Sequence, residues 1–305
     1  MGRKDKIDIA TGVIVINKHE GVTSHRIVQI LRKFFDTPRI GHTGTLDPMA
    51  TGVLPILVGR AVKASDFLVA EDKEYIAEMT LGIRTDTDDI TGEILEECQN
   101  IPDESAVNEA IASFIGDIEQ IPPMYSAIKV GGVKLVDLAR EGITIERKSR
   151  NVRINSIESE KIAEKVYRMR VSCSKGTYIR TLCHDIGEKL GCGAAMSALQ
   201  RTKSGSFTIE NSYTIEDLEN LTIEERAKLV KPTEELFIDC PAIEVNDFYA
   251  KLIRGGTELY QKKLGTSIEL GQYVRIKHNN EFIALGQVSE YQAGTAVRPV
   301  KLFVL

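Results

Sequence analysis

The sequence has no tryptophan, few aromatic residues and no long apolar run. Aromatic side chains make up 6% of its 305 residues. No apolar stretch approaches the roughly 20 residues that cross a bilayer as a helix. The N-terminal MGRKDKIDIATG also lacks the apolar segment of a signal peptide. We therefore expect a cytoplasmic protein that does not enter a membrane.

Cysteine is scarce as well. The five cysteines are scattered, with no C-x-x-C pair and no spacing to the five histidines that is typical of a zinc site. We interpret them as reduced, mostly buried thiols. Cys183 and His184 are neighbours, but adjacency in sequence does not make a catalytic dyad. The sequence therefore predicts no metal site and no thiol chemistry.

The composition that remains is that of an ordinary globular protein, with 42% hydrophobic and 27% charged residues. A chain of 305 residues exceeds the size at which a single core usually stops growing. We therefore expect two domains, one large and one small.

The net charge of -5 is spread unevenly along the chain. Residues 1–70 carry 10 basic and 6 acidic groups, and residues 71–120 carry 2 and 15. Residues 121–210 carry 16 and 9, and residues 211–305 carry 11 and 14. A polyanion is attracted to a face built from the first and third segments and repelled by the second, although a charge run is usually only a solvated surface.

Alternating strand and helix patterns predict a mixed α/β or α+β body. Residues 12–18 form an apolar strand, and the apolar spacing after Thr23 and Ser24 predicts a capped helix. A short strand at 53–59 is followed by a predicted helix at 60–72. Further predicted elements are a strand at 73–82, a helix at 103–115, a strand at 167–174 and a helix that ends at Gly191.

The last quarter of the chain predicts a small β domain. KPTEELFIDCP, residues 231–241, is interpreted as a linker. Beyond it, two alternating runs flank a His-Asn-Asn-Glu turn, and the chain ends in the strand-like VRPVKLFVL. This pattern is typical of a small β barrel or sandwich.

An acidic stretch at 86–97, DTDDITGEILEE, places two aspartates and a glutamate as an EF-hand loop does. The glycine required at the sixth position is replaced by Thr91, and Ile90 occupies the fifth. The stretch is therefore not expected to bind calcium.

The stretch GHTGTLDPMATG, residues 41–52, gathers three glycines and three threonines around a single carboxylate, Asp47. Glycine tolerates positive φ, Pro48 disfavours helical backbone at Asp47, and threonine hydroxyls bind nearby backbone groups. These residues predict an ordered loop that presents Asp47. Taken alone, an Asp-Pro pair more often marks a simple Asx-type turn.

Four separated motifs, read together, resemble a known family. They are INKHEGVTS (16–24), GHTGTLDPMATGVLPI (41–56), KEYIAEMTLGIRTDTDD (73–89) and SKGTYIRTL (174–182). In this order and spacing they resemble the bacterial tRNA pseudouridine synthase B family, and the resemblance extends over essentially the whole chain. It implies an α+β pseudouridine synthase fold, in which helices flank a mixed, largely antiparallel central sheet.

The resemblance also implies two domains and a substrate. Residues 1–237 match the catalytic domain, with a basic RNA-binding arm at about 124–153, and residues 238–305 are similar to a PUA RNA-binding domain. The expected activity is isomerisation of the T-loop uridine (position 55) of tRNA to pseudouridine, by base flipping and an aspartate nucleophile. The expected partner is the tRNA T stem-loop, the protein is expected to be a monomer, and the chemistry requires no cofactor and no metal.

The resemblance assigns roles to individual residues of the active site. Asp47 matches the catalytic nucleophile, and Arg180 matches the arginine that faces it and keeps it charged. Tyr75 matches the tyrosine that stacks on the flipped base, while Tyr178 and Leu199 match residues that line the pocket. Without the resemblance, each of the last three would be interpreted as a core residue.

Further matched residues are expected at the RNA. His42 matches a histidine that fills the space left by the extracted base, and Lys18 matches a lysine whose role is either structural or close to RNA. The glycines and threonines of the Asp47 loop are expected to let the RNA backbone approach closely. The basic side chains expected to bind RNA from the arm are Lys129, Lys134, Arg147 and Lys148.

One motif departs from the family, and two other functions compete. His19 follows Lys18 where the family commonly has proline, which bears on the geometry of that turn. The alternatives to a stand-alone tRNA enzyme are a guide-RNA-dependent pseudouridine synthase subunit and a protein that mainly binds or folds RNA. A carbohydrate hydrolase is disfavoured because no second acidic motif pairs with Asp47.

Overall fold

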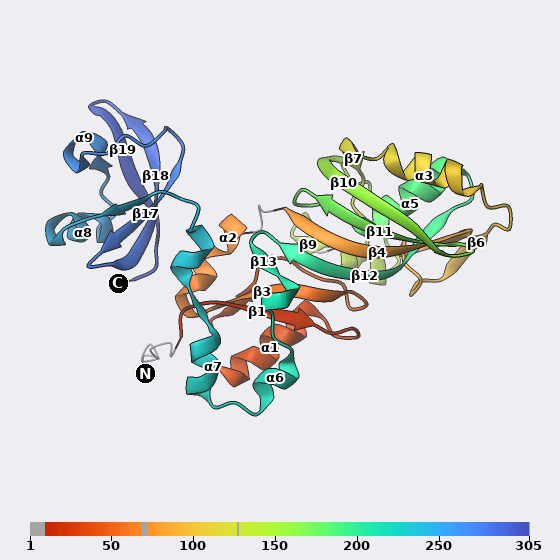
Figure 1. The fold of residues 1–305 in the computed structure, drawn as a ribbon, viewed down its shortest axis with the longest axis horizontal. Coiled ribbons are helices and arrows are strands. Elements are labelled where there is room, and N and C mark those ends of the chain that lie inside the picture. The colour runs from red at the N-terminus through yellow and green to blue at the C-terminus, as the bar shows by residue number, and fades with distance from the viewer. Residues whose placement is uncertain (1–9, 69–71, 127, 305) are drawn as a thin grey trace.

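The computed structural model describes residues 10–68, 72–126 and 128–304 (Figure 1). Within these residues, a ten-stranded sheet forms the larger body and a five-stranded sheet forms a smaller C-terminal one. Figure 1 shows the smaller sheet beside one end of the larger body. The expected α+β architecture, with a large mixed sheet and a small β domain, is confirmed.

The large sheet has the strand order β14-β1-β3-β12-β4-β11-β10-β7, with β2 paired to β3 and β13 paired to β12. Among the described strands of this sheet, every pairing is antiparallel except that of β3 with β12. The largely antiparallel character follows the prediction. The strands are β1 (Gly12–Lys18), β2 (Ile40–His42), β3 (Thr51–Val58), β4 (Lys73–Leu81), β7 (Gly116–Gln120), β10 (Arg150–Ala163), β11 (Val166–Cys173), β12 (Ala194–Ser204), β13 (Phe207–Thr208) and β14 (Lys231–Pro232).

The parallel contact between β3 and β12 joins the two halves of the sheet beside the Asp47 loop. Thr51 lies opposite Gln200, and Gly52 lies opposite Arg201. Gly52 has φ +98°, and a Cβ atom there would lie 2.2 Å from the carbonyl oxygen of Arg201. This glycine of the motif is therefore required by a close contact inside the protein, whether or not RNA backbone approaches it.

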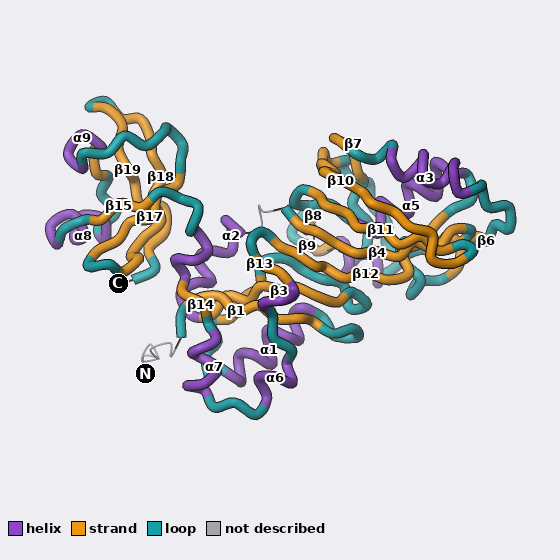
Figure 2. Tube along the Cα trace, viewed as in Figure 1, coloured by secondary structure: helices purple, strands orange, loops and turns teal. Residues whose placement is uncertain are grey.

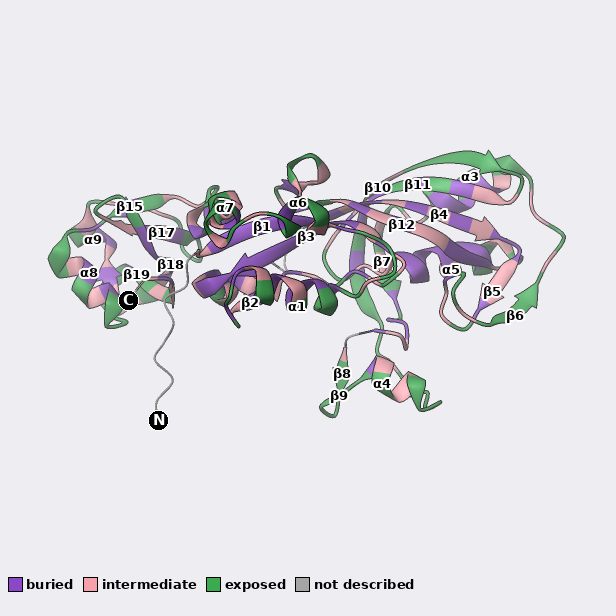
Figure 3. Cartoon of the chain, turned by 90° about the horizontal axis from the view of Figure 1, so that it is seen from below, coloured by how far each residue is buried: buried purple, intermediate pink, exposed green. Residues whose placement is uncertain are grey.

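The helices are short and mostly capped as the sequence predicts. Thr23 caps α1 by accepting a hydrogen bond from the backbone N–H of Arg26, and Gly191 ends α5 with φ +70°. Figure 3 shows α1 and α5 on the same side of the large sheet. The helices of the larger body are α1 (Ser24–Phe34), α2 (Ser65–Leu68), α3 (Glu104–Ala112), α4 (Leu135–Arg140), α5 (Ile179–Leu190), α6 (Ile215–Glu219) and α7 (Ile223–Leu229).

Strand β1 is buried on both faces because two separate cores lie against it. Ile14 and Ile16 belong to the main core, which α1 and α5 also enter. Val13 and Val15 point to the opposite face and belong to a second core. That second core includes residues of the C-terminal sheet, so β1 lies between the main core and a core that the larger body shares with the smaller domain.

The segment 231–241, predicted to be a linker, is instead part of the second core. It forms β14 and the 3₁₀ helix η3 (Thr233–Phe237), in which Leu236 and Phe237 are buried. The Phe237 ring centroid lies 5.8 Å from that of Phe282 and 5.9 Å from that of Phe303. Two apolar side chains within a polar, proline-containing stretch are enough to fix it against both sheets.

The helix predicted at 60–72 begins as a 3₁₀ helix and not as an α-helix, so the prediction is wrong in the kind of helix. The structure has a 3₁₀ helix, η1 (Gly59–Ala64), followed by one turn of α2, and the last residues of the prediction lie outside the described ranges. Ala61 and Ala64 are fully buried. Their spacing of three residues matches the period of a 3₁₀ helix, and this turn brings both onto the core.

The basic arm forms a small hairpin and a helix that stand out from the body. Strands β8 (Lys129–Val130) and β9 (Val133–Lys134) flank the predicted Gly131-Gly132 turn, and α4 follows. In Figure 3 this unit projects from the side of the sheet on which α1 and α5 lie. The arm ends earlier than predicted, because β10 begins at Arg150 and its residues 150–153 pair with β7.

The C-terminal sheet has the order β15-β17-β18-β19-β16, and Figure 2 labels β15, β17, β18 and β19 within it. The predicted hairpin is confirmed, and its turn residues Asn279 and Asn280 have φ values of 51° and 63°. The elements of this domain are β15 (Ala242–Glu244), α8 (Asp247–Arg254), β16 (Leu259–Tyr260), α9 (Gln261–Leu264), β17 (Tyr273–His278), β18 (Glu281–Tyr291) and β19 (Gly294–Leu302).

Candidate active site

The loop that carries Asp47 connects β2 to β3 and is anchored on both sides of the carboxylate. Before it, the Ser24 hydroxyl donates to the Leu46 carbonyl at 3.0 Å and accepts from the Leu46 N–H at 2.8 Å. After it, the Ala50 N–H donates to the Asp47 carbonyl at 3.1 Å. Leu46 and Ala50 are themselves buried. The backbone is therefore held on both sides, while the Asp47 side chain stays 34% exposed.

Lys18 closes the base of this loop from β1. Its side chain is fully buried, and its ammonium donates to the carbonyl oxygens of His19, Val22 and Pro48 at 3.0, 2.8 and 3.1 Å. Burial lowers the pKa of Lys18 to about 8, against the opposing effect of Asp47. All three protons are used inside the protein, which favours the structural role over the expected contact with RNA. His19 stands where the family motif commonly has proline, and its backbone carbonyl is one of the three that accept from Lys18.

Arg180 lies at the start of α5 and faces Asp47, as the motif predicts. Its Nε lies 3.0 Å from Asp47 Oδ2, and its Nη2 donates to Asp47 Oδ1 at 3.3 Å. The guanidinium is only 5% exposed. It also donates to the carbonyl oxygens of Tyr125 at 2.8 Å and Thr87 at 3.2 Å. The fork therefore holds the carboxylate at two points, while two other segments of the chain, at Thr87 and at Tyr125, hold the fork.

Asp89 is a member of this cluster that sequence reasoning missed. Its Oδ2 lies 3.6 Å from Arg180 Nη1, and its side chain is 6% exposed. The carboxylate also accepts from the N–H and hydroxyl of Thr91. Asp89 belongs to the acidic stretch 86–97, which the sequence analysis considered only as a calcium-binding loop. The repeated aspartates of that stretch were the one sign that it could contribute charge to the site.

Burial, more than the surrounding charges, opposes the ionisation of Asp47. Partial burial raises the pKa of the Asp47 carboxyl above its ordinary value of 3.8, and the nearby Asp89 acts in the same direction. Arg180 and Lys18 act against this and lower the pKa. The two-point contact with Arg180 is thus the largest favourable influence on the charged form.

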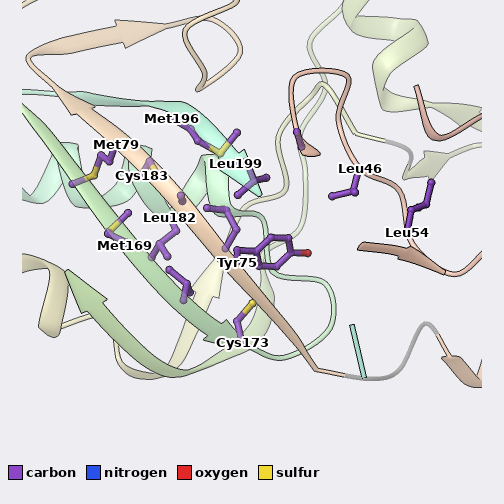
Figure 4. Close-up of a cluster of buried hydrophobic side chains, with 14 of the residues drawn as sticks. Leu46, Leu54, Tyr75, Met79, Met169, Cys173, Leu182, Cys183, Met196 and Leu199 are labelled. Carbon is purple, nitrogen blue, oxygen red and sulfur yellow. The ribbon is translucent and has the colours of Figure 1, made fainter. Parts of the chain in front are cut away.

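Tyr75 lies on β4 at the edge of the main core, 7% exposed. Figure 4 shows its ring at the margin of the buried cluster, with the hydroxyl pointing to the side where Leu46 lies. Burial raises the pKa of Tyr75, and the nearby Arg201 guanidinium acts against this and lowers it. Leu199, on β12, is 8% exposed and pairs with Ala77, two residues along β4 from Tyr75.

Arg201 is a second buried cation that the sequence did not reveal. It is 1% exposed, and it donates to the carbonyl oxygens of Val53 at 2.7 Å and Gly44 at 3.2 Å. It therefore ties β12 to both ends of the Asp47 loop, and it lies opposite Tyr75 of β4. Arg201 lies within β12, and no pattern in the sequence distinguished it from a surface arginine.

Tyr178 precedes α5, and its backbone is fixed by Gln120. The Gln120 side chain is 2% exposed; it accepts from the Tyr178 N–H at 3.0 Å and donates to the Tyr178 carbonyl at 3.2 Å. Because Arg180 follows two residues later, Gln120 fixes the direction in which α5 begins. The Tyr178 side chain is half-buried, and burial raises its pKa.

His42 ends β2 on the approach to the Asp47 loop. Burial and the nearby Arg201 lower the pKa of its imidazole below 6.5, so the ring is neutral at neutral pH. Its Nδ1 is buried without a hydrogen-bond partner among the described residues. A neutral ring with a free nitrogen is available to a ligand in this region.

The four basic residues of the arm divide into two kinds. Lys129, Lys134 and Lys148 are exposed. Arg147 is half-buried, and its Nη1 donates to the Pro122 carbonyl at 3.0 Å, which ties the end of the arm to its beginning. The structure brings Asp47, Arg180, Tyr75, Tyr178 and Leu199 to one region of the body, and it places the three lysines on the projecting arm.

No metal-binding group was found among the described residues: none of their His, Cys, Asp and Glu side chains form a cluster of three or more that could hold an ion. The described helices also include none long and apolar enough to span a membrane. The five cysteines are free, and three of them are buried, as expected.

The models of two known domain families match two consecutive parts of the chain. The TruB family pseudouridylate synthase (N terminal domain) matches residues 32–179, and the tRNA pseudouridylate synthase B C-terminal domain matches residues 180–238. Asp47 therefore lies in the first match, and Arg180 begins the second.

Curated relatives and solved structures agree with these matches. The chain is 45% identical over 278 residues to tRNA pseudouridine synthase B of Clostridium tetani, covering 90% of this chain and 95% of that protein. It is 44% identical over 288 residues to tRNA pseudouridine synthase B of Francisella tularensis subsp. novicida, covering 93% of each.

Among solved structures, a Cbf5-Nop10-Gar1 complex contains a chain with a TM-score of 0.74 and 29% identity, covering 99% of this chain and 88% of that one. An H/ACA RNP bound to a substrate RNA containing 2'-deoxyuridine gives a TM-score of 0.73 and 27% identity, covering 97% and 86%. The arrangement around Asp47 and these similarities lead to one assignment: the chain belongs to the TruB family of pseudouridylate synthases.

Proposed function

We propose that this protein converts the T-loop uridine (position 55) of tRNA to pseudouridine. Its curated relatives, 44–45% identical over most of the chain, are named tRNA pseudouridine synthase B. The observation that carries the proposal is the two-point contact of Arg180 with Asp47, at 3.0 and 3.3 Å. This contact supplies an oriented carboxylate, which is the group that the reaction requires.

The reaction moves one bond and one proton within the nucleotide. The N1–C1′ glycosidic bond breaks, the uracil rotates, C5 bonds to C1′, and the proton lost from C5 is replaced by one gained at N1. Neither electrons nor phosphate are transferred, so carboxylate chemistry is sufficient. Asp47 stabilises or bonds to the electron-poor C1′, removes a neighbouring sugar proton, or adds to C6 of the base, and these first steps remain alternatives.

We assign the residues beside Asp47 to binding and orienting the uracil. Tyr75 presents an aromatic ring at the edge of the core and stacks on the base, with Arg201 opposite it on β12. Leu199 and Tyr178 line the pocket. Extracting a stacked base costs a few kcal/mol, and His42 offsets part of this cost by filling the space that the base leaves.

We assign the exposed lysines of the arm, Lys129, Lys134 and Lys148, to the phosphates of the T stem-loop. The Arg147 side chain instead ties the end of the arm to its beginning, through the Pro122 carbonyl. Residues 1–237 act as the catalytic domain and residues 238–305 as a PUA-like RNA-binding domain. The protein works as a monomer on tRNA, and hence in the cytoplasm.

Guide-dependent modification is the second candidate, because the two solved neighbours come from Cbf5-containing and H/ACA assemblies. Their identity of 27–29% is well below that of the curated tRNA enzymes. A protein that only binds or folds tRNA is the third candidate, and it gives no reason for a carboxylate held at two points by a buried arginine.

Purified protein and an unmodified tRNA transcript, with no guide RNA, separate the three candidates. We expect one T-loop uridine to become pseudouridine, located by chemical mapping of the product. Asp47→Asn should abolish isomerisation and leave tRNA binding within about threefold, because it changes one oxygen and keeps the side-chain volume. A requirement for guide RNA would favour the second candidate, and full activity of Asp47→Asn would exclude the proposed nucleophile.

A further inference from the structure

Helix α5 carries three charged side chains at successive turns, and each faces an opposite charge on the segment 84–89. Arg180 Nη1 lies 3.6 Å from Asp89 Oδ2, and His184 Nδ1 lies 3.2 Å from Asp88 Oδ1. One turn later Glu188 pairs with Arg84 of β5 (Ile83–Thr85). Positions four residues apart share one helix face, so the acidic segment is bound along α5 by three ion pairs.

The middle pair acts at a backbone position with an unusual conformation. Asp88 is a non-glycine residue with φ 61°, in the left-handed region. Its carbonyl accepts from the Met196 N–H at 3.0 Å, and the Met196 carbonyl accepts from the Ile90 N–H at 3.0 Å. These bonds fix the backbone on the β12 side, and the His184 contact fixes the Asp88 side chain on the α5 side.

The residues on either side of Asp88 are the ones that hold the proposed catalytic arginine. The Thr87 carbonyl accepts from Arg180 Nη1 at 3.2 Å, and the Asp89 carboxylate lies against the same nitrogen. A change in the Asp88 conformation therefore moves both contacts at once. Arg180 in turn holds Asp47 at two points, so the geometry of that pair depends on this turn.

We propose that His184 is a positioning residue for the Asp47–Arg180 pair, acting through the Asp88 side chain and the turn formed by residues 87–89. This inference rests on the proposed function, because it presumes that the Asp47–Arg180 pair carries the reaction. His184 does not contact Asp47 or Arg180 through any hydrogen bond found in the described part of the chain. Its effect on the reaction is transmitted by the turn.

The His184 contact depends on pH. The hydrogen bond that the His184 imidazole donates to the Asp88 carboxylate raises the pKa of the imidazole above 6.5, with smaller contributions from Glu188 and Asp185 on the same helix, while burial lowers it. The other charges facing this region are Arg84, which is paired with Glu188, and Arg180 one turn earlier. Because the folded-state pKa is raised, the charged pair is complete below pH 6.5 and is lost as the pH rises through the raised value.

The test compares single-turnover rate constants on saturating unmodified tRNA between pH 6 and 9. Below the pKa of His184, we expect His184→Gln to lower the rate constant about three- to tenfold. As the pH rises, the wild type should approach the His184→Gln variant, so that their ratio falls toward one. His184→Lys keeps its charge over this range, and its ratio to His184→Gln should stay constant.

His278→Gln is the matched control. His278 Nε2 lies 2.7 Å from Asp247 Oδ1 in the C-terminal domain, so the variant removes a histidine–aspartate pair far from α5. At saturating tRNA, the ratio of its rate constant to that of the wild type should not change with pH. A second measurement uses the unaltered protein: the backbone amide NMR signals of Thr87, Asp88 and Asp89 should shift with the same pKa as the His184 ring.

Two results would overturn the inference. One is a wild-type to His184→Gln ratio that does not change with pH, and the other is a set of residue 87–89 amide signals that do not follow the His184 titration. Either result leaves the proposed function intact if Asp47→Asn is inactive. If Asp47→Asn remains active, the proposed function itself fails, whatever His184 does.

Discussion

The guanidinium of Arg180 contacts both carboxylate oxygens of Asp47, at 3.0 Å from Nε and 3.3 Å from Nη2, across 133 residues of sequence. A contact at two points fixes the plane of the carboxylate as well as its charge. Single-point contact with a flexible ammonium would fix neither. The relationship therefore makes Arg180 the group on which the orientation of Asp47 depends.

Replacing Arg180 with lysine should preserve the charge and remove the fork. We expect Arg180→Lys to lower the single-turnover rate constant about 100-fold, equivalent to about 2.7 kcal/mol, because Asp47 loses its fixed direction. The contacts to the Thr87 and Tyr125 carbonyls cannot all be kept by a single nitrogen. Arg168→Lys is the control, since Arg168 forms exposed ion pairs with Glu78 and Glu160 on the sheet. Equal loss in both variants would show that Arg180 has no special role.

The pH dependence of the reaction should report the pKa of Asp47. Burial raises that pKa above 3.8, so the folded protein holds the proton more tightly than the free side chain does. Ionised Asp47 is present only above the raised value, and the rate should fall as the pH decreases through it. The acid limb of the single-turnover rate should therefore lie above pH 3.8.

Asp89→Asn should move this acid limb to lower pH. The negative charge of Asp89 contributes to the raised pKa of Asp47, and the amide removes that charge at nearly constant volume. The plateau rate should also decrease, because Arg180 loses one of its partners. Asp247→Asn, at a 93% exposed side chain in the C-terminal domain, should leave the limb unchanged. A shift of the limb to higher pH would contradict this account of the site.

The arm lysines should contribute to the salt dependence of tRNA binding, and Arg147 should contribute differently. Replacing Lys129, Lys134 and Lys148 together with alanine should weaken binding and reduce the slope of log K against log salt by roughly two to three, one unit per lost phosphate contact. Arg147→Ala should weaken binding with a smaller change in slope, because its charge is used at the Pro122 carbonyl. Binding measured between about 50 and 200 mM salt gives the slopes. An unchanged slope in the triple variant would remove the arm from the phosphate contacts.

The sequence predicted most of the elements and the central pair of the site. The alternation of β4, the Thr23 cap of α1 and the Gly191 end of α5 follow local rules, and each is confirmed. The Asp47–Arg180 pair came from motif resemblance, since no local rule connects two residues 133 positions apart.

What the sequence did not reveal depends on tertiary packing. Asp89 and Arg201 look like surface charges in a pattern-based reading, yet one is 4% and the other 1% exposed. Their partners are backbone carbonyls and distant side chains, which no spacing rule encodes. The segment 231–241 was misinterpreted for the same reason, because its two apolar side chains find their core only when both sheets are present.

Phe237 provides a test of that shared core. Its ring contacts Phe282 and Phe303 of the C-terminal domain and Phe67 of the catalytic body, with centroids 5.8 to 5.9 Å apart. Phe237→Ala should destabilise the protein by about 3–5 kcal/mol, because it leaves a cavity between two sheets. Phe248→Ala, at a 66% exposed ring on α8, should change stability by less than about 0.5 kcal/mol.

The shape of the unfolding curve carries further information about this junction. Because β1 is buried between the two cores, the wild type should unfold in one transition that near-UV and far-UV circular dichroism report at the same denaturant concentration. In Phe237→Ala the C-terminal sheet loses one of its aromatic contacts with the body, and the two signals should separate. Two separate transitions already in the wild type would show that the aromatic cluster does not couple the domains. A single transition in Phe237→Ala, shifted by the full cavity penalty, would place the coupling in the remaining contacts of η3 with β1.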